Sequence, residues 1–417
     1  MPNPKSRLKN RSAPGGCHGG VGVAVIIGTT VLLCLEDRGV GDMGTNVSRR
    51  GFAVSALGSA GLALAGCTGP NAGTGGGAQA MSAGTPVRTF DMHADTVDNL
   101  GMVSHKPYSG FNDKFQGTLA SNNCQVSADR MDGMPWVQCY AIWLPDDNGD
   151  EAMQSEISHV QWYREAVRWF RGQMEQLKDA FEQVRNFSDI PRILEEGKVA
   201  AVLTVENAAC LDQGIGFVDE FANDGVLIAG ITWNGRNVLG CGNTFVDEGL
   251  TDLGRQYVAA LEDRGIVVDV SHLNEKGFWD VEGVARKPYV ATHSNSRAVC
   301  GHLRNLTDDQ FRALTARGGV VGLNFHDTFV RDGGHAYTFD ELAAHVEHWL
   351  ELGGENAIAL GADRDGGSLP TWLADCSSQA YLYERFAERI GESAARKLFY
   401  ENAMNFYRDL GHQGVTP

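Results

Sequence analysis

The stretch VAAVLTVE at residues 199–206 carries the pattern that decides the fold. Seven residues that are almost all apolar and suited to a β-strand are followed at once by a carboxylate. A strand that is apolar on both faces is typical of a parallel sheet covered by helices on each side. Seven more short β-rich runs occur from residue 88 onward. They are Arg88–His93, Val137–Trp143, Val226–Thr232, Ile266–Ser271, Pro288–Thr292, Gly319–Phe325 and Ala357–Ala362.

Helix-like segments separate these runs. Thr251–Arg264 and Phe339–Leu352 carry apolar residues three and four positions apart, and a longer segment, about Met153–Val184, is rich in helix formers and charge. Eight strands that alternate with helices predict a (β/α)8 barrel of the TIM type over residues 87–417. An open, doubly wound parallel sheet is the alternative that the same alternation allows.

In such a barrel the chemistry lies at the carboxyl ends of the strands. Polar side chains that suit a reaction centre follow five of the runs. They are His93-Ala94-Asp95 after the first, Glu206 after the third, Ser271-His272 after the fifth, His293 after the sixth and Asp363-Arg364-Asp365 after the eighth. Each residue alone is a weak signal, because a histidine at a strand end is more often structural than a ligand. Their joint occurrence predicts one site.

The residue types favour a metal centre without thiolates. Imidazole and carboxylate are the ligands that zinc takes when no cysteine is offered. His93 and Asp95 point the same way if their segment is extended, so they can share one ion. His272 and His293 follow neighbouring strands and can share another, and Glu206 has two oxygens with which to bridge both. The sequence therefore predicts two ions, about 3.5–4 Å apart, on either side of a water molecule.

Six motifs, in this order, resemble those of the membrane (renal-type) dipeptidase family over roughly residues 88–410. They are Phe90-Asp-Met-His-Ala-Asp95, Thr204-Val-Glu-Asn207, Asp269-Val-Ser-His-Leu273, Thr292-His-Ser-Asn-Ser296, Arg304-Asn305 with Asp308-Asp309, and Gly361-Ala-Asp-Arg-Asp-Gly366. The resemblance implies a dipeptidase with two zinc ions, bound by the five residues named above. It also implies that Arg304 holds the substrate's C-terminal carboxylate and that Asp363 is the catalytic acid and base.

The fourth run departs from the family pattern. Renal-type members place a substrate-contacting histidine at its end, whereas this chain has Thr232-Trp233-Asn234. An indole cannot polarise a carbonyl as an imidazole does, but Trp233 can stack on a substrate side chain. Asn234, Arg236 and His326 are the candidates for the missing contact. A second difference is Arg364, which we expect to be an ordinary solvated charge.

Two other functions are compatible with these patterns. A related amidohydrolase-type barrel with the same site would act on another amide, a lactam or an ester, because a fold alone does not choose the substrate. A lipoprotein that binds peptides without cleaving them is the second, although a binding protein has no need of five metal ligands. Metal analysis and a comparison of dipeptides with N-acyl amino acids and phosphotriesters separate the three.

The N-terminal region reads as an export signal. Ser48-Arg49-Arg50-Gly51-Phe52 is typical of a twin-arginine signal, and the apolar stretch after it ends in Leu64-Ala65-Gly66-Cys67, a lipoprotein cleavage box. The alternative, a membrane anchor, conflicts with an apolar stretch of about 14 residues, since about 20 span a bilayer. We expect residues 43–67 to be the signal, Met43 to be the true start after a doubtful extension at 1–42, and the Gly-rich residues 68–86 to be a tether.

Composition limits the partners. The formal net charge is −17, and because residues 1–67 carry +4, the remainder carries −21, which argues against nucleic acid. The expected partners are a dipeptide substrate and, through a lipid on Cys67, the membrane of an exported cell-envelope protein; a homodimer is a further option. Nine cysteines occur without a CxxC pair, and the sequence alone predicts no disulfide pairing.

Overall fold

The computed structural model describes residues 87–102, 115–146 and 157–412, with the side chains of 411 and 412 excepted. These residues form short parallel strands joined by helices. The strands are β1 (Thr89–Ala94), β2 (Trp136–Trp143), β3 (Phe181–Gln183), β4 (Val199–Glu206), β5 (Val226–Gly230), β6 (Val267–Asp269), β7 (Val321–Leu323) and β8 (Ile358–Leu360).

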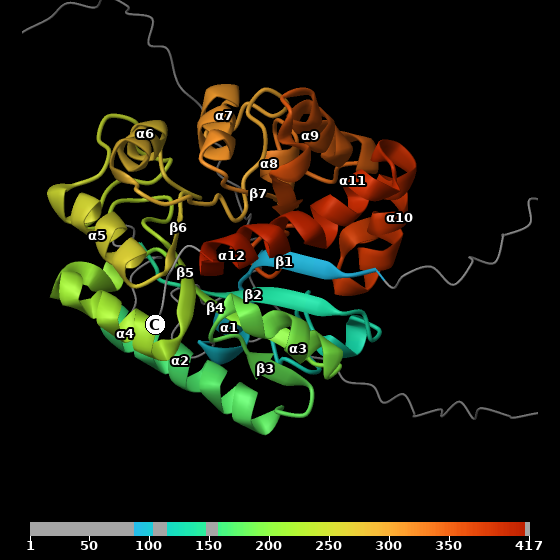
Figure 1. Ribbon diagram of the computed structural model, residues 1–417, viewed down its shortest axis with the longest axis horizontal. Helices are drawn as coiled ribbons and strands as arrows, with labels where there is room; N and C mark the ends of the chain where they lie inside the picture. The colour runs from blue at the N-terminus through green and yellow to red at the C-terminus, as the bar shows by residue number, and fades with distance from the viewer. Residues whose placement is uncertain (1–86, 103–114, 147–156, 413–417) are drawn as a thin grey trace, which may run out of the picture. The chain divides into compact units, whose positions relative to one another are not determined.

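The sheet closes into a barrel. Seven strands follow the order β6-β5-β4-β2-β1-β8-β7, each parallel to its neighbours. The gap between β6 and β7 is filled by the segment 288–292, in which Val290 bridges to Asp269 of β6 and Ala291 bridges to Val321 of β7. The ring therefore has eight members, as the sequence predicts. Figure 1 shows β1 and β2 side by side, with the helices around the strands. The sixth run contributes only these two bridges and no regular strand.

Helices cover the outside of the ring. They are α1 (Thr96–Gly101), α2 (His159–Gln176), α3 (Ile190–Glu195), α4 (Val218–Asp224), α5 (Asp252–Asp263), α6 (Glu275–Val284), α7 (Asp308–Ala316), α8 (Asp327–Val330), α9 (Phe339–Glu351), α10 (Gln379–Ile390), α11 (Glu392–Arg396) and α12 (Asn402–His412). Side-chain caps begin several of them: Thr307 and Thr338 each open a capping box that satisfies the first free N–H groups of α7 and α9.

One sequence-based assignment was wrong. The segment Met153–Val184 was expected to be a single helix, but α2 ends at Gln176 and the chain then forms β3, which pairs in parallel with the first residues of β4. Leu177 caps the helix, and Phe181 is almost fully buried. Pairing with a distant strand outweighs the local helix preference, and that partner is invisible to a local pattern.

An irregularity in β1 places the first predicted ligand. The pairing of β1 with β2 shifts register between Asp91 and Ala94. Phe90, before the shift, belongs to an apolar cluster with Cys139 of β2 and Val202 of β4. After the shift, His93 lies beside the carboxylate of Glu206 at the end of β4. The bulge therefore turns the His93 side chain into the barrel interior, above the apolar cluster that contains Phe90.

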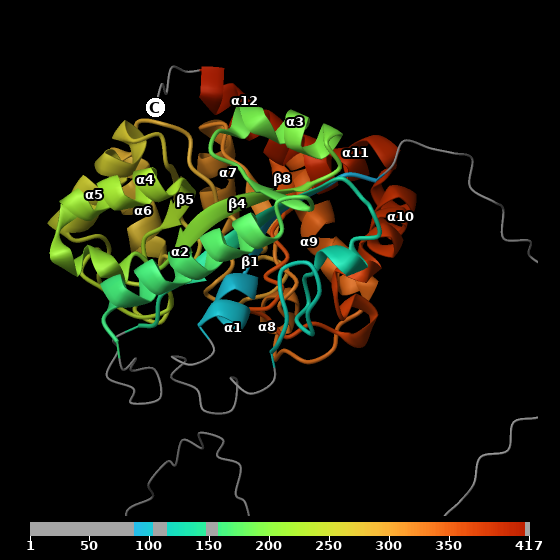
Figure 2. The ribbon, with the colours of Figure 1, turned by 90° about the horizontal axis from the view of Figure 1, so that it is seen from below.

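The two ends of the barrel differ. Phe406 and Tyr407 of α12 and Ile190 of α3 belong to the inner apolar cluster and close one end. Figure 2 shows α12 and α3 at that end, and α1 and α8, which follow β1 and β7, at the other. The carboxyl ends of the strands meet at the end marked by α1 and α8, so the candidate residues gather there.

None of the helices in the described part of the chain is long and apolar enough to cross a membrane. The predicted start at Met43, the twin-arginine signal, Cys67 and the tether all lie outside the described residues.

Candidate metal centre

Five predicted ligands converge at the mouth of the barrel. Nε2 of His93 lies 3.4 Å from Oδ2 of Asp95 and 3.3 Å from Oε2 of Glu206. Nε2 of His272 lies 2.7 Å from Oε1 of Glu206 and 2.9 Å from Nε2 of His293. The two oxygens of Glu206 thus face different imidazole groups, and all five side chains are buried.

These donor atoms fit a metal. Two atoms that each bind a zinc ion at about 2.1 Å in tetrahedral geometry lie roughly 3.4 Å apart, close to the separations observed. Donor atoms of His93, Glu206 and His293 lie within 4.8 Å of one another, and so do those of His93, Asp95 and Asp363. Imidazole nitrogen and carboxylate oxygen crowd together here, and a cation would relieve that crowding.

The backbone is unusual at several strand ends. His272 has φ of 69° and Asp363 has φ of 56°, while Asn207, next to Glu206, has φ of 63°. This left-handed region is costly for residues other than glycine and is found where the surrounding structure enforces it, often at active sites. Here it turns side chains that follow β4, β6 and β8 into one space.

Hydrogen bonds fix the orientation of two imidazoles. Oδ1 of Asn234 lies 2.9 Å from Nδ1 of His272, and because an amide oxygen only accepts, this Nδ1 carries the proton. The Thr292 hydroxyl donates to Asp269 at 2.5 Å and so accepts from Nδ1 of His293 at 2.7 Å. In both residues Nε2 is left with a lone pair that faces Glu206, which is the tautomer that a metal requires.

Electrostatics agree with that protonation state. Burial, together with nearby Arg304 and His93, lowers the pKa of His272 and of His293 well below the usual value. For His93 burial acts in the same direction, but the carboxylates of Asp95 and Glu206 outweigh it and raise the pKa. Burial and the charge of Asp95 raise the pKa of Glu206 to about 8. The shifts differ in direction because His272 and His293 are affected mainly by burial and by positive neighbours, whereas His93 and Glu206 lie against carboxylates.

Asp363 lies at the edge of this cluster. Its Oδ2 accepts a hydrogen bond from Nδ2 of Asn324 at 2.8 Å, and the same amide donates to the backbone oxygen of His293. Burial raises the pKa of Asp363 above the usual value. Gly366 lets this loop approach, since a Cβ there would collide with the carboxylate of Asp95. Asp363 is therefore held beside the predicted ligands by a neutral donor.

Arg304 is a buried cation with donors to spare. Nη1 donates to Oγ of Ser294 at 2.7 Å, whereas Nε and Nη2 have no hydrogen-bond partner among the described residues. Burial lowers the pKa of Arg304 to about 10, so the side chain is charged at neutral pH. Buried guanidinium groups are normally fully hydrogen-bonded. The two unpartnered guanidinium nitrogens of Arg304, close to Ser294, indicate an anion-binding position.

Arg364 differs from the expectation of a solvated charge, which was wrong. The side chain is fully buried, with Nη1 at 3.1 Å from Oδ2 of Asp91 and Nη2 at 2.9 Å from Oε1 of Gln379. Asp91 in turn accepts from the backbone N–H of Ala362 at 2.8 Å. The chain turns Arg364 away from the mouth because its neighbours Asp363 and Asp365 both adopt positive φ. The buried pair ties β1 to the loop after β8.

A cavity of about 280 Å³ opens above the cluster. Trp233, Asn234 and His326 line it, and the amide oxygen of Asn234 is already engaged by His272. Arg236, the third candidate for the missing substrate contact, instead pairs with Glu248 at 3.3 Å and does not line this cavity.

Several residues of this site escaped the sequence analysis, among them Trp143, Phe329 and Asn324. Trp143 and Phe329 line the cavity, and Asn324 holds Asp363. Trp143 ends β2 and Asn324 follows β7 directly, so the strand-end rule applied to every run would have found both. Phe329 lies on α8, and no local signal marks it.

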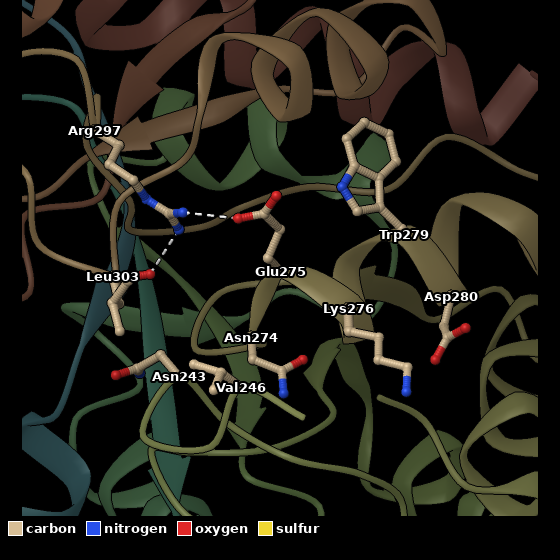
Figure 3. A pocket seen from close by; sticks show the side chains of 9 residues that line it. All are labelled: Asn243, Val246, Asn274, Glu275, Lys276, Trp279, Asp280, Arg297 and Leu303. Atoms are coloured by element: carbon tan, nitrogen blue, oxygen red, sulfur yellow. Dashed lines mark hydrogen bonds and ion pairs between the residues drawn. The ribbon is translucent and has the colours of Figure 1, made fainter. Parts of the chain in front are cut away.

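A second, larger cavity of about 490 Å³ lies outside the barrel mouth, between α6 and the loops at 243–248 and 297–303 (Figure 3). Its charged groups are satisfied by neighbours: Arg297 contacts Glu275 and the backbone oxygen of Leu303, and Nζ of Lys276 donates to the backbone oxygen of Asp247. No cluster of candidate metal ligands occurs there among the described residues.

The family model described as membrane dipeptidase (peptidase family M19) matches residues 78–412. The chain belongs to the membrane dipeptidase family. The family resemblance carried by the six motifs is confirmed, and the chain is a metallo-dipeptidase of the M19 family. Curated relatives include a Klebsiella pneumoniae protein of the pqqA 5′ region, 34% identical over 54% of this chain and 88% of its own length. A second, from the PQQ-III 3′ region of Acinetobacter calcoaceticus, is 31% identical over 64% of this chain and 90% of its own length.

Solved structures of M19 dipeptidases share the barrel. A Rhodobacter sphaeroides metallopeptidase, liganded with a phosphinate mimic of the dipeptide L-Ala-D-Ala, is 26% identical with a TM-score of 0.66, over 78% of this chain and 99% of that one. Dipeptidase AC, a metallopeptidase of family M19, is 25% identical with a TM-score of 0.65, over 78% of this chain and 98% of that one. These neighbours confirm the predicted fold class, and membership of the family implies that metal ions take part.

Proposed function

We propose that this metallo-dipeptidase uses two zinc ions, held by His93 and Asp95 on one side, by His272 and His293 on the other, and bridged by Glu206. The observation that carries the proposal is that the two oxygens of Glu206 face separate imidazole groups at 3.3 and 2.7 Å. The donor types are those that zinc accepts in the absence of thiolate. Zinc ions held by these residues would lower the pKa of a bound water and polarise the scissile carbonyl.

The chain's own residues supply the rest of the chemistry. Arg304 binds the C-terminal carboxylate of the dipeptide through its unpartnered Nε and Nη2, ideally in a bidentate contact. That contact selects short substrates with a free C-terminus and so favours a dipeptidase over an endopeptidase. Asp363 takes a proton from the attacking water and returns it to the leaving amine. Asn324 keeps one oxygen of Asp363 fixed while the other is free to act.

Asp363 has a second assignment to exclude. Its carboxylate lies near donor atoms of His93 and Asp95, so it could be a further ligand. We assign Asp363 as the proton carrier because five other residues already provide two ligands for each ion and one bridging carboxylate. Its raised pKa also suits a group that must hold a proton for part of the cycle.

A metal assay paired with a substrate panel tests the proposal. The purified protein should hold about two zinc ions per chain and cleave dipeptides faster than N-acyl amino acids or phosphotriesters. Glu206→Gln should weaken both sites together, whereas His293→Ala should mainly weaken one. Full activity after exhaustive chelation would contradict the metal mechanism, and a preference for N-acyl amino acids or phosphotriesters would contradict the dipeptide assignment.

We also propose that the protein is exported and anchored by a lipid on Cys67. The support is the order of an arginine pair, an apolar stretch and a lipoprotein box in the sequence. Replacing both Arg49 and Arg50 by Lys should leave precursor in the cytoplasm. Cys67→Ala should abolish lipid labelling while leaving the peptidase active, because the barrel lies downstream of the tether. Lipid labelling that survives Cys67→Ala would overturn the anchoring.

A further inference from the structure

The cavity above the metal centre has two chemically different ends. Trp143 is the last residue of β2 and Trp233 follows β5, and these are the strands on either side of β4. Arg304 follows the segment 288–292, and Phe329 follows β7. In the closed ring of eight, β7 stands opposite β4. The two indoles and the Arg304 end therefore lie across the barrel mouth from each other, with the predicted ligands between them.

The indole end is a preformed wall of two aromatic rings. The rings of Trp143 and Trp233 meet edge to face, with centroids 5.3 Å apart and an interplanar angle of 79°. Trp143 also packs edge to face on Trp162, which is fully buried. Its backbone N–H donates to Oδ2 of Asp98 at 2.7 Å. Both indoles line the cavity, and Trp233 leans toward His272, with ring centroids 6.2 Å apart.

Phe329 and His326 line the opposite end, and the buried cation Arg304 lies against the Phe329 ring. The guanidinium carbon of Arg304 lies 5.7 Å from the centroid of the Phe329 ring. The centroid of the His326 ring lies 4.7 Å from that of Phe329. Arg304 is the buried cation with free donors on this side, so a C-terminal carboxylate belongs here. A dipeptide held by that carboxylate, with its peptide bond at the metal centre, must direct its N-terminal residue across the mouth.

We infer that Trp143 and Trp233 form the subsite for the side chain of the N-terminal residue, and that they select a large apolar or aromatic side chain there. The inference rests on the proposed function, because the direction of the substrate depends on Arg304 and the metal centre. Edge-to-face indoles offer a third ring a surface on which offset or T-shaped contact is favourable. Removing one indole should cost such a side chain its contact without affecting a glycine.

Two dipeptides with the same atoms in opposite order give the sharpest test. Phe-Gly places the ring at the N-terminal position and Gly-Phe at the C-terminal one. The measured quantity is the ratio of kcat/KM for Phe-Gly to kcat/KM for Gly-Phe. This ratio is independent of the fraction of folded or metal-loaded enzyme, so a general loss in a variant does not disturb it.

Trp233→Ala should lower this ratio by about tenfold or more, since loss of a hydrophobic contact of this size changes discrimination by that order. Trp233→Phe should restore most of it, because a ring remains. Phe329→Ala should move the ratio the other way. Trp279→Ala is the matched control: it removes an exposed indole that lines the outer cavity, and the ratio should stay unchanged.

The outcomes separate the inference about the indole subsite from the proposal that dipeptides are the substrates. If both dipeptides are cleaved but Trp233→Ala leaves the ratio unchanged, the subsite is wrong while the dipeptidase proposal stands. If the zinc-loaded wild type cleaves neither dipeptide, the substrate assignment fails. The ratio of the two dissociation constants, measured by calorimetry on wild type and Trp233→Ala, then decides the subsite by the same criterion.

Discussion

Two cavities of the described structure, one outside the barrel mouth and one above the candidate metal centre, differ in size and in chemistry, and the smaller one holds the candidate site. The outer cavity, about 490 Å³, is lined by side chains whose charges are paired or exposed. The inner cavity, about 280 Å³, is lined by buried imidazole and carboxylate groups, and nearby Arg304 has two guanidinium nitrogens without a hydrogen-bond partner among the described residues. Buried polar groups without partners are costly, so a fold retains them where a ligand completes them. Volume alone would have pointed to the wrong cavity.

The two cavities nevertheless share a wall. Asn243 lines the outer cavity and donates to Oδ1 of Asn234, which lines the inner one and holds His272. Arg297 in the outer wall donates to the backbone oxygens of Leu303 and Asn305, on either side of Arg304. The outer region therefore supports the inner one, and substitutions on the two sides should have effects of very different size.

The largest effect on rate is expected at Asp363. Asp363→Asn keeps the shape and removes the base, so kcat should fall by roughly 10²–10⁴ while zinc content stays near that of the wild type. Steady-state kinetics together with metal analysis measures both. Loss of a zinc ion, or a rate above about a tenth of the wild-type value, would show that Asp363 is not the proton carrier.

Arg364 should have the largest effect on stability. Arg364→Met leaves Asp91 buried without its cation, and breaking a buried pair in this way costs on the order of 3–5 kcal/mol of the free energy of unfolding. Denaturant titration measures the loss. Adding Asp91→Asn to the same variant should recover part of it, because the uncompensated charge disappears. A cost below about 1 kcal/mol would mean that water reaches Asp91.

The next largest effect is expected at Arg304, which acts through binding of the substrate. Arg304→Ala should cost on the order of 2–4 kcal/mol in kcat/KM, because a charged contact in a buried site is lost. Amidating the C-terminus of the dipeptide should cost about as much in the wild type. The two changes together should cost little more than either alone, since both remove the same contact. Equal rates for the amidated and free dipeptides would refute the assignment.

Asn234 should have a smaller effect, on metal binding. Asn234→Ala removes the acceptor that orients His272, and loss of such a contact typically lowers metal affinity by about 10–100-fold. Competition with a chelator measures the zinc affinity. Asn243→Ala removes a hydrogen bond to Asn234 and not to His272, so it should change the zinc affinity less. An unchanged affinity in Asn234→Ala would mean that packing alone orients the imidazole.

The smallest effect is expected at Glu275 in the outer cavity. Its pair with Arg297, at 3.0 Å, has nearly the same length as the buried pair of Arg364, but the glutamate side chain is 55% exposed. Exposed pairs contribute about 0–1 kcal/mol, so Glu275→Gln should change stability by no more than that and leave kcat/KM unaffected. A loss as large as that in Arg364→Met would remove the distinction between the two regions.

The strand pattern predicted much of the site because, in a barrel, a residue's position directly after a strand tells at which end of the barrel it lies. Parallel strands end at one edge, so His93, Glu206 and His272 could be placed together from their positions after apolar runs alone. Trp143 followed the same rule and was overlooked. The register shift in β1, which aims His93 inward, could not be predicted, because it depends on how β1 pairs with β2.

The sequence by itself determined that eight strand-like runs alternate with helices around a barrel, and which residues lie at its mouth. Both follow from periodicity and from residue type. Only the tertiary structure decided which of those residues are buried and what each one contacts. Arg364 looks like any surface arginine until α10 covers it, and Asn234 looks like a loop residue until its oxygen meets His272. Burial and long-range contact depend on segments far apart in the chain, and these set the charge, the tautomer and the direction of every group in the site.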